Sequence, residues 1–128
     1  MRLLLDTHAL VWWLEGSPRL SVGAGRAIAD PLNEKLVSAA SAWEITTKHR
    51  LGKLPGADEF AGEIPWAIAD EGFAELPITV DEAARAGGLP GPLGDPFDRM
   101  LIAQALSRNL TVVSVDSVFD GYGVRRLW

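Results

Sequence analysis

The chain has 128 residues, a hydrophobic fraction of 48%, a net charge of −5 and no cysteine. Its length and apolar content predict one domain, residues 1–128, and the lack of cysteine excludes a disulfide framework or a thiolate metal site. The acidic balance argues against nucleic-acid binding through overall charge alone, and Asp6 and His8 interrupt the apolar start, so neither a signal peptide nor a membrane span is expected.

Short apolar runs alternate with helical patterns from the start of the chain. Residues 2–5 predict a first strand, and a helix over residues 9–15 follows, with Thr7 in position to cap it. Small residues over 21–29 predict a second helix, and residues 36–38 predict the second strand.

The middle of the chain continues this alternation. A helix is expected over residues 39–51, where Gly52 ends it, and residues 57–71 are expected to be helical with a kink or boundary at Pro65. Residues 73–78 resemble a third strand.

The last third begins with a short helix over residues 79–86 and an irregular loop over residues 87–94, which is expected to be mobile and to line a site. Asp95 and Pro96 then open a helix that ends at Asn109. Further strands are predicted at residues 110–115 and 124–128.

Strands that alternate with helices predict a three-layer α/β/α sandwich with a central parallel sheet. Sites in such folds lie at the carboxyl ends of the strands. Five acids follow a strand or open a helix at that edge, and we expect them to converge. They are Asp6, Glu44, Asp95, Asp98 and Asp116.

Each of these acids also has a purely local interpretation. Asp6 and Asp95 could be helix caps, Glu44 could complete a capping box with Ser41, and Asp116 could start a turn. Five acids with independent capping roles would seldom lie at the same edge of one sheet by chance. For Asp95 the two roles, an accessory acid or only a cap, stay equally open.

Clustered carboxylates predict a bound proton or a bound cation, because two such charges 4 Å apart repel by about 4 kcal/mol at an effective dielectric constant near 20. Oxygen donors, no cysteine and only two histidines favour Mg²⁺ or Mn²⁺ over Zn²⁺. Such an ion lowers the pKa of bound water and stabilises a phosphoryl transition state. The chemistry that fits this site is phosphodiester hydrolysis.

Four motifs give the sequence a specific resemblance. They are Leu-Leu-Asp-Thr-His-Ala at residues 4–9, Ser-Ala-Trp-Glu-Ile at 41–45, Asp-Pro-Phe-Asp-Arg-Met-Leu-Ile-Ala-Gln-Ala at 95–105 and Val-Val-Ser-Val-Asp at 112–116. In this order and spacing they resemble the PIN-domain ribonucleases, and within them the VapC-type toxins of toxin–antitoxin pairs. The resemblance spans nearly the whole chain.

The resemblance implies a metal-dependent endoribonuclease with a PIN-like fold. Asp6, Glu44, Asp98 and Asp116 match the acidic quartet that binds Mg²⁺ or Mn²⁺ in that family. It further implies a cytoplasmic protein that forms homodimers, cleaves RNA and is bound by an antitoxin along a groove.

Other polar residues have a functional and a structural interpretation side by side. Thr7 and Ser114 flank the acids and could bind water or phosphate, or could serve only as cap and strand-end groups. Arg99 could contact RNA or pair with Asp95, and His8 is expected to face solvent without acting as a base.

Basic side chains gather at the end of the helix over residues 39–51. Such a patch could contact RNA, but cations are also favourable at any helix C-terminus. The patch consists of Lys48, His49, Arg50 and Lys53.

The tryptophans Trp12, Trp13, Trp43 and Trp66 are expected to be mostly core. Trp12 and Trp13 are adjacent on one helix, so they cannot both point inward, and one is expected to be exposed as part of a protein-binding surface.

Two other functions remain open at this point. One is a metal-dependent phosphohydrolase for small molecules or a phospho-acceptor receiver, although no lysine follows Asp116 and no aspartate ends the third strand. The other is a non-catalytic binding module with a PIN fold, against which all four acids of the motif are intact.

Overall fold

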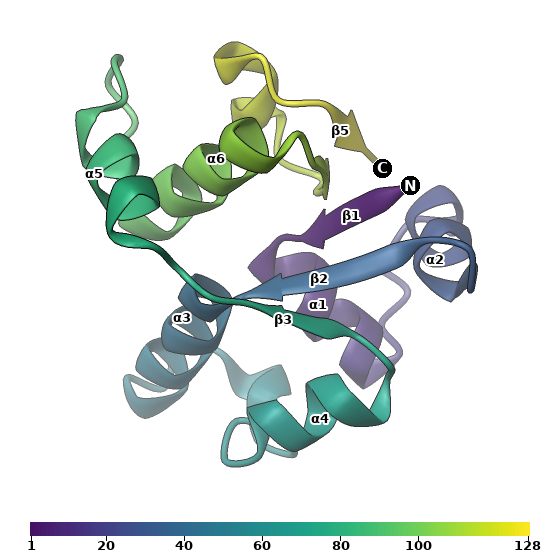
Figure 1. The fold of residues 1–128 in the computed structure, drawn as a ribbon. Coiled ribbons are helices and arrows are strands. Elements are labelled where there is room, and N and C mark those ends of the chain that lie inside the picture. The colour runs from purple at the N-terminus through teal and green to yellow at the C-terminus, as the bar shows by residue number, and fades with distance from the viewer.

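The computed structural model describes residues 1–128 and contains one five-stranded, fully parallel sheet (Figure 1). The strands are β1 (Arg2–Leu5), β2 (Glu34–Ser38), β3 (Ala74–Leu76), β4 (Thr111–Val113) and β5 (Arg126–Leu127). Their order is β3-β2-β1-β4-β5, so the most apolar strand lies in the centre, where both of its faces are covered.

Six α-helices and two 3₁₀ helices connect the strands. The α-helices are α1 (Thr7–Glu15), α2 (Val22–Ala29), α3 (Ala39–Arg50), α4 (Ile64–Asp70), α5 (Val80–Gly88) and α6 (Pro96–Arg108). The 3₁₀ helices are η1 (Pro55–Ala57) and η2 (Ser117–Tyr122). None of the helices has the length and apolarity needed to cross a lipid bilayer.

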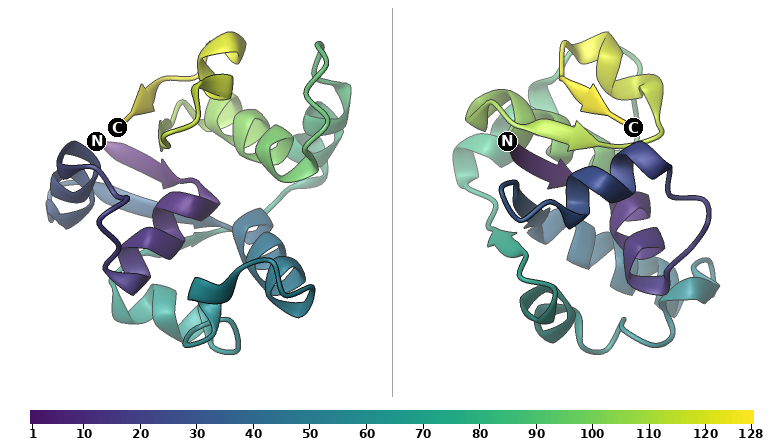
Figure 2. Two further views of the ribbon diagram at one scale, coloured as in Figure 1. Left: turned by 180° about the vertical axis from the view of Figure 1, so that it is seen from behind. Right: turned by 90° about the vertical axis from the view of Figure 1, so that its right-hand side faces the viewer.

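Two hydrophobic cores, one on each face of the sheet, make the three layers. Leu3 and Leu5 of β1 pack with α1, α2 and α4, whereas Leu4 points to the other face and packs with α6 and η2. Seen from behind, α1 and α4 lie on one side of the sheet and α5 and α6 on the other (Figure 2). The predicted α/β/α sandwich with a central parallel sheet is therefore confirmed.

Several element boundaries differ from the prediction. The predicted helix over residues 57–71 is wrong in its first half, because α4 begins only at Ile64, with Pro65 in its first turn, and η1 and turns precede it. Asp6, not Thr7, is the N-cap of α1, since its carboxylate accepts the hydrogen bond from the amide of Ala9.

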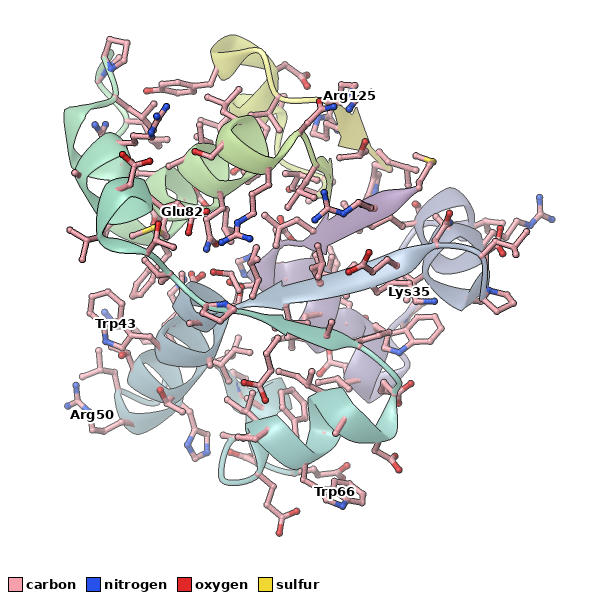
Figure 3. The ribbon with its side chains drawn as sticks, viewed as in Figure 1. Lys35, Trp43, Arg50, Trp66, Glu82 and Arg125 are labelled. Atoms are coloured by element: carbon pink, nitrogen blue, oxygen red, sulfur yellow. The ribbon has the colours of Figure 1, made fainter.

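The expectation of a buried Trp43 and Trp66 is also wrong. The exposed fraction is 61% for Trp43 and 65% for Trp66, and both side chains project outward from their helices (Figure 3). On α3 the inward positions are taken by the neighbours Ser41, Glu44 and Ile45, which leaves Trp43 on the outer face.

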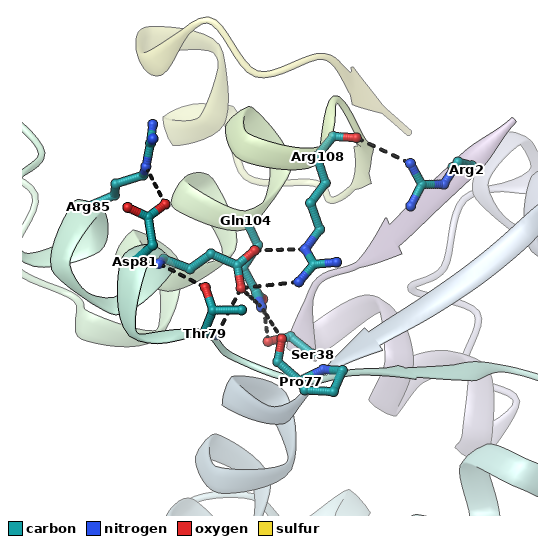
Figure 4. Close-up of polar contacts among 9 residues, drawn as sticks. Arg2, Ser38, Pro77, Thr79, Asp81, Arg85, Gln104 and Arg108 are labelled. Atoms are coloured by element: carbon teal, nitrogen blue, oxygen red, sulfur yellow. Dashed lines mark hydrogen bonds and ion pairs between the residues drawn. The ribbon is translucent and has the colours of Figure 1, made fainter.

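A buried polar network ties α5 to α6 and to the sheet (Figure 4). Glu82 of α5 accepts a hydrogen bond of 2.7 Å from Nε of Arg108 on α6. Gln104 of α6 donates to the carbonyl of Pro77 and accepts from the hydroxyl of Ser38, which caps α3. The same network therefore fixes the start of the helix that carries Glu44.

Candidate active site

The acids predicted from the sequence line one pocket at the carboxyl edge of the sheet. Its volume is about 390 Å³. Its walls come from the end of β1, from α1 and α3, from the start of α6 and from the turn after β4. The lining residues are Asp6, Thr7, His8, Trp12, Glu44, Lys48, Asp95, Asp98, Val115 and Asp116.

Asp6 lies at the base of this pocket and is held by its backbone amide and by its carboxylate. Its amide donates to the carbonyl of Val113 across the sheet, and its Oδ1 accepts a 2.7 Å hydrogen bond from the amide of Ala9. Only 6% of the residue is exposed. Burial raises the pKa of Asp6, against the lowering effect of hydrogen bonds from Ser114 and Ala9.

Asp98 is the acid that the pocket perturbs most clearly. It lies in the first turn of α6, whose N-cap Asp95 accepts hydrogen bonds from the amides of Phe97 and Asp98. Burial and, after it, the charges of the surrounding carboxylates, with Asp95 the strongest, together raise the pKa of Asp98 to about 7.

Glu44 carries its own counter-ion. It is 4% exposed, and the ammonium of Lys48, one helical turn further along α3, forms a short hydrogen-bonded ion pair with its Oε2. Lys48, which the sequence places in a basic patch, therefore lines the acidic pocket. The i,i+4 spacing of Glu44 and Lys48 was the sequence signal for this placement.

Asp116 and Ser114 close the pocket on the side of β4. The hydroxyl of Ser114 is buried and accepts a 3.0 Å hydrogen bond from the amide of Asp116, while it also contacts Asp6. The carboxylate of Asp116 accepts from the amide of Val118 and caps η2, yet the residue remains exposed. Ser114 therefore links two of the four acids.

Thr7 has a structural hydrogen bond at the pocket wall. Its hydroxyl donates to the hydroxyl of Ser41 at 3.1 Å, and both residues are buried. This bond joins the first turn of α1 to the first turn of α3, which places Asp6 beside Glu44. His8, which the sequence analysis places in solvent, is exposed at the mouth of the pocket.

The donor set of the pocket fits a hard divalent cation. Its candidate ligands are carboxylates, which suit Mg²⁺ or Mn²⁺, and the pocket holds no sulfur ligand. No three of the acidic or histidine side chains stand close enough to enclose one ion together. Mg²⁺ commonly keeps several waters and uses only one or two carboxylates, so this spacing suits a partly hydrated ion.

The other predicted RNA-contacting residues do not gather at the pocket. Arg50, the last residue of α3, and Lys53, which follows the helix, are both exposed, and Figure 3 shows Arg50 pointing outward. His49 pairs with Asp58 at 2.9 Å. The guanidinium of Arg99 forms four hydrogen bonds to backbone carbonyls of the preceding segment, which leaves no bond to Asp95.

Trp12 and Trp13 are both half-buried, so neither is the fully exposed member that the sequence predicts. Trp12 lines the acidic pocket and lies against Trp128, with ring centroids 5.8 Å apart. Trp13 packs against Phe73, and its indole nitrogen donates to Glu71. Both rings also border a shallow groove beside α2.

The chain is similar to proteins of a known family. A family model described as PIN domain matches residues 3–124. Ribonuclease VapC22 of Mycobacterium tuberculosis is 32% identical over 119 residues, which cover 89% of this chain and 86% of that protein. Ribonuclease VapC16 of the same organism is 43% identical over 81 residues, but the match spans only 56% of its length and 57% of this chain.

A solved structure supports the fold independently. VapBC2 from Rickettsia felis, bound to a DNA fragment from their promoter, aligns with a TM-score of 0.64 over 98% of this chain and 97% of that chain. The sequence identity is 12%, so this likeness concerns the fold alone.

Proposed function

Because the chain belongs to the PIN domain family, we propose that it is a metal-dependent endoribonuclease and the toxin of a toxin–antitoxin pair. The observation that carries the proposal is the convergence of Asp6, Glu44, Asp98 and Asp116 on one pocket. The family model covers all four acids, and two relatives bear the name ribonuclease.

In this proposal the quartet Asp6, Asp98, Asp116 and Glu44 would hold a partly hydrated Mg²⁺ or Mn²⁺, with one or two carboxylates bound directly and the others reached through water. A bound ion of this kind supplies a more acidic water and stabilises the charge of a phosphoryl transition state. The raised pKa of Asp98 supports the proposal, since burial and like charges disfavour ionisation there and a bound cation would offset both.

The side chains around the acids have supporting roles in the proposal. Lys48 places its ammonium group beside Glu44 at the pocket wall, where it would donate to a phosphate oxygen of the substrate. Asp95 is an accessory acid as well as the cap of α6. Ser114 and Thr7 position the acids through the hydrogen bonds described above.

RNA cleavage by the purified protein tests the proposal. Total RNA is incubated with Mg²⁺ or EDTA, and cut sites are mapped for the wild type, Asp6→Asn, Glu44→Gln and Asp98→Asn. We expect cleavage with Mg²⁺ only and a loss of several orders of magnitude in each variant, because residues that act as one unit fail together. Asp70→Asn, an exposed acid outside the pocket, is the matched control.

Full cleavage by Asp98→Asn in EDTA would refute the metal-dependent mechanism. Hydrolysis of small phosphate esters without cleavage of RNA would instead favour a small-molecule phosphohydrolase. Binding of RNA without any cut would favour the non-catalytic PIN module.

The partners in this proposal are an RNA substrate, a cognate antitoxin and a second copy of the chain. The groove beside α2, bordered by Trp12 and Trp13, is the surface proposed for the antitoxin. Copurification with a small protein encoded beside this chain tests it. Weaker retention by both Trp12→Ala and Trp13→Ala is expected, and unchanged retention by both would place the contact elsewhere.

A further inference from the structure

A second cavity lies next to the acidic pocket and is unlike it in chemistry. Its volume is about 770 Å³, and it lies between the loop at residues 90–94 and η2. Pro90, Pro92 and Leu93 form one wall, and Val118 and Tyr122 form the other. No charged side chain lines it.

Both walls of this cavity begin at acids of the candidate active site. Gly94 directly precedes Asp95, and Ser117 directly follows Asp116. Consecutive Cα atoms are about 3.8 Å apart, so the apolar cavity adjoins the acidic pocket along both chain segments. A chain molecule bound at the acids therefore has the cavity beside it.

The loop wall is fixed in place from two sides. Arg99 donates to the carbonyls of Ala86 at 2.9 Å and Leu93 at 2.7 Å, and also to those of Gly87 and Leu89. The Tyr122 hydroxyl donates to the carbonyl of Pro90 at 2.8 Å. The cavity is therefore formed before any ligand arrives, which lowers the cost of binding.

A glycine permits this close approach of loop and ring. Gly91 has a φ of +88°, and a Cβ at this position would lie 3.0 Å from the Tyr122 hydroxyl oxygen. The loop backbone thus passes directly beside Tyr122, whose ring remains half-buried at the cavity wall.

We propose that this cavity binds an unpaired nucleobase of the RNA, next to the phosphodiester that meets the acids. The inference rests on the proposed ribonuclease function, and it adds that the cavity beside the acids binds a base of the same RNA. Single-stranded RNA is recognised by bases that leave the stack and lie against aromatic or apolar side chains, as the ring of Tyr122 offers here. An uncharged wall suits a base and not the backbone.

Binding of short RNA strands tests the proposal in an Asp98→Asn background, which prevents cleavage. The probes are fluorescent oligoadenylate, oligouridylate and an abasic ribose-phosphate strand of the same length. We expect Tyr122→Leu to weaken binding of the base-containing strands about tenfold, within the range for one lost base stack, and to leave the abasic strand unchanged. Tyr122→Phe, which keeps the ring, should recover most of the affinity.

Two further variants complete the design. Trp66→Leu removes an exposed aromatic ring on α4, far in sequence from the cavity, and should bind every probe as the parent does. Val118→Asn makes the opposite wall polar while it leaves the hydrogen bond from Tyr122 to Pro90 in place, so it tests the cavity if Tyr122→Leu fails to fold. We expect it to weaken only the base-containing strands.

Equal losses on base-containing and abasic strands would overturn the inference, because the cavity would then act on the backbone or through the fold. Unchanged RNA affinity in both wall variants would also overturn it, and weaker antitoxin retention in the same variants would assign the cavity to a protein partner. These results are separable from failure of the proposed function. Wild-type protein that cuts RNA while both wall variants bind normally would reject the base site alone.

Discussion

Three aspartates of the candidate site each perform a local structural task at the position where they meet the pocket. Asp6 caps α1, Asp95 caps α6 and Asp116 caps η2. The local interpretation of these acids and their functional interpretation are therefore both compatible with the structure. Each aspartate marks the start of the helix that it caps, and the parallel sheet brings these helix starts together at one edge.

The raised pKa of Asp98 makes a prediction about stability and pH. Its pKa rises from 3.8 to about 7, so between these values the folded protein binds more protons than the unfolded chain. The contribution is fully present below about pH 4 and is lost as pH rises through 7. Because Asp98 is partly exposed and solvent screens its charge, the free energy of unfolding should fall by roughly 1–2 kcal/mol over this range. Urea unfolding of metal-free protein from pH 4 to 8 measures this.

Asp98→Asn is the matched comparison for that profile. An amide resembles the protonated acid, so the variant should lose most of the slope and be more stable than the wild type at pH 8, by roughly 1–2 kcal/mol. Parallel profiles for the two proteins would show that Asp98 titrates normally and that the pocket does not hold its proton.

At the scale of elements, α6 owes its starting point to Asp95, and two substitutions separate the two roles of this residue. Asp95→Ala removes the cap and should destabilise the protein by about 1 kcal/mol, whereas Asp95→Asn keeps an equivalent cap. We expect Asp95→Asn to preserve stability and yet lower RNA cleavage about tenfold, roughly 1.4 kcal/mol in the barrier, because it removes one of the negative charges in the pocket that attract the cation. Unchanged cleavage by Asp95→Asn would leave Asp95 as a cap only.

The pair of α5 and α6 depends on the buried ion pair between Glu82 and Arg108. This hydrogen bond lowers the pKa of Glu82 from 4.5 to about 2. The stabilisation is present above pH 4.5 and is lost as pH falls toward 2. Because Arg108 is partly exposed, we expect Glu82→Gln to cost roughly 1–3 kcal/mol at pH 7 and less near pH 2.

Thermal unfolding of both proteins across this acidic range measures the effect. Glutamine at this position still completes the capping box with Thr79, so the loss reports the ion pair and not the cap. A constant difference between Glu82→Gln and the wild type at all pH values would contradict the linkage.

The sequence pattern predicted the sheet, its parallel direction and the acids at one edge, because strand periodicity and strand ends are local signals. It failed where tertiary contacts decide. Residues 57–71 had a helical pattern, yet helix begins only at Ile64. Trp43 had the composition of a core residue, but α3 already turns Glu44 and Ile45 inward.

Within the candidate site the same division holds. The four acids stand in motifs that can be recognised along the chain. Lys48 instead belongs to a basic run, which predicted a surface patch, although its ion pair with Glu44 places it in the pocket. Arg99 braces a loop through backbone carbonyls, which carry no sequence signal of their own. Tyr122 meets Pro90 across 32 residues, a distance over which no periodicity extends.

At the scale of the whole molecule, the acidic pocket opposes folding unless a cation is bound. Asp6 and Glu44 are almost fully buried, Asp98 has a raised pKa, and Lys48 is the one lysine or arginine that lines the pocket. A ligand that binds only the folded state stabilises it by mass action, by about 3 kcal/mol when its concentration is a hundred times its dissociation constant. Mg²⁺ should therefore raise the unfolding midpoint of the wild type.

Asp98→Asn should be more stable than the wild type without metal and should respond less to Mg²⁺. Metal-free Asp98→Asn is expected to be more stable than the metal-free wild type, because one repelling charge is gone, and to gain much less from Mg²⁺, because one ligand is gone. Thermal or urea unfolding of both proteins, each with EDTA and with millimolar Mg²⁺, measures the two differences. Asp70→Asn should behave as the wild type does in both conditions, since its carboxylate lies outside the pocket.

If α6 needed Asp98 only for its helix dipole, the result would be reversed. The amide would then destabilise the protein, and Mg²⁺ would shift the midpoint of neither.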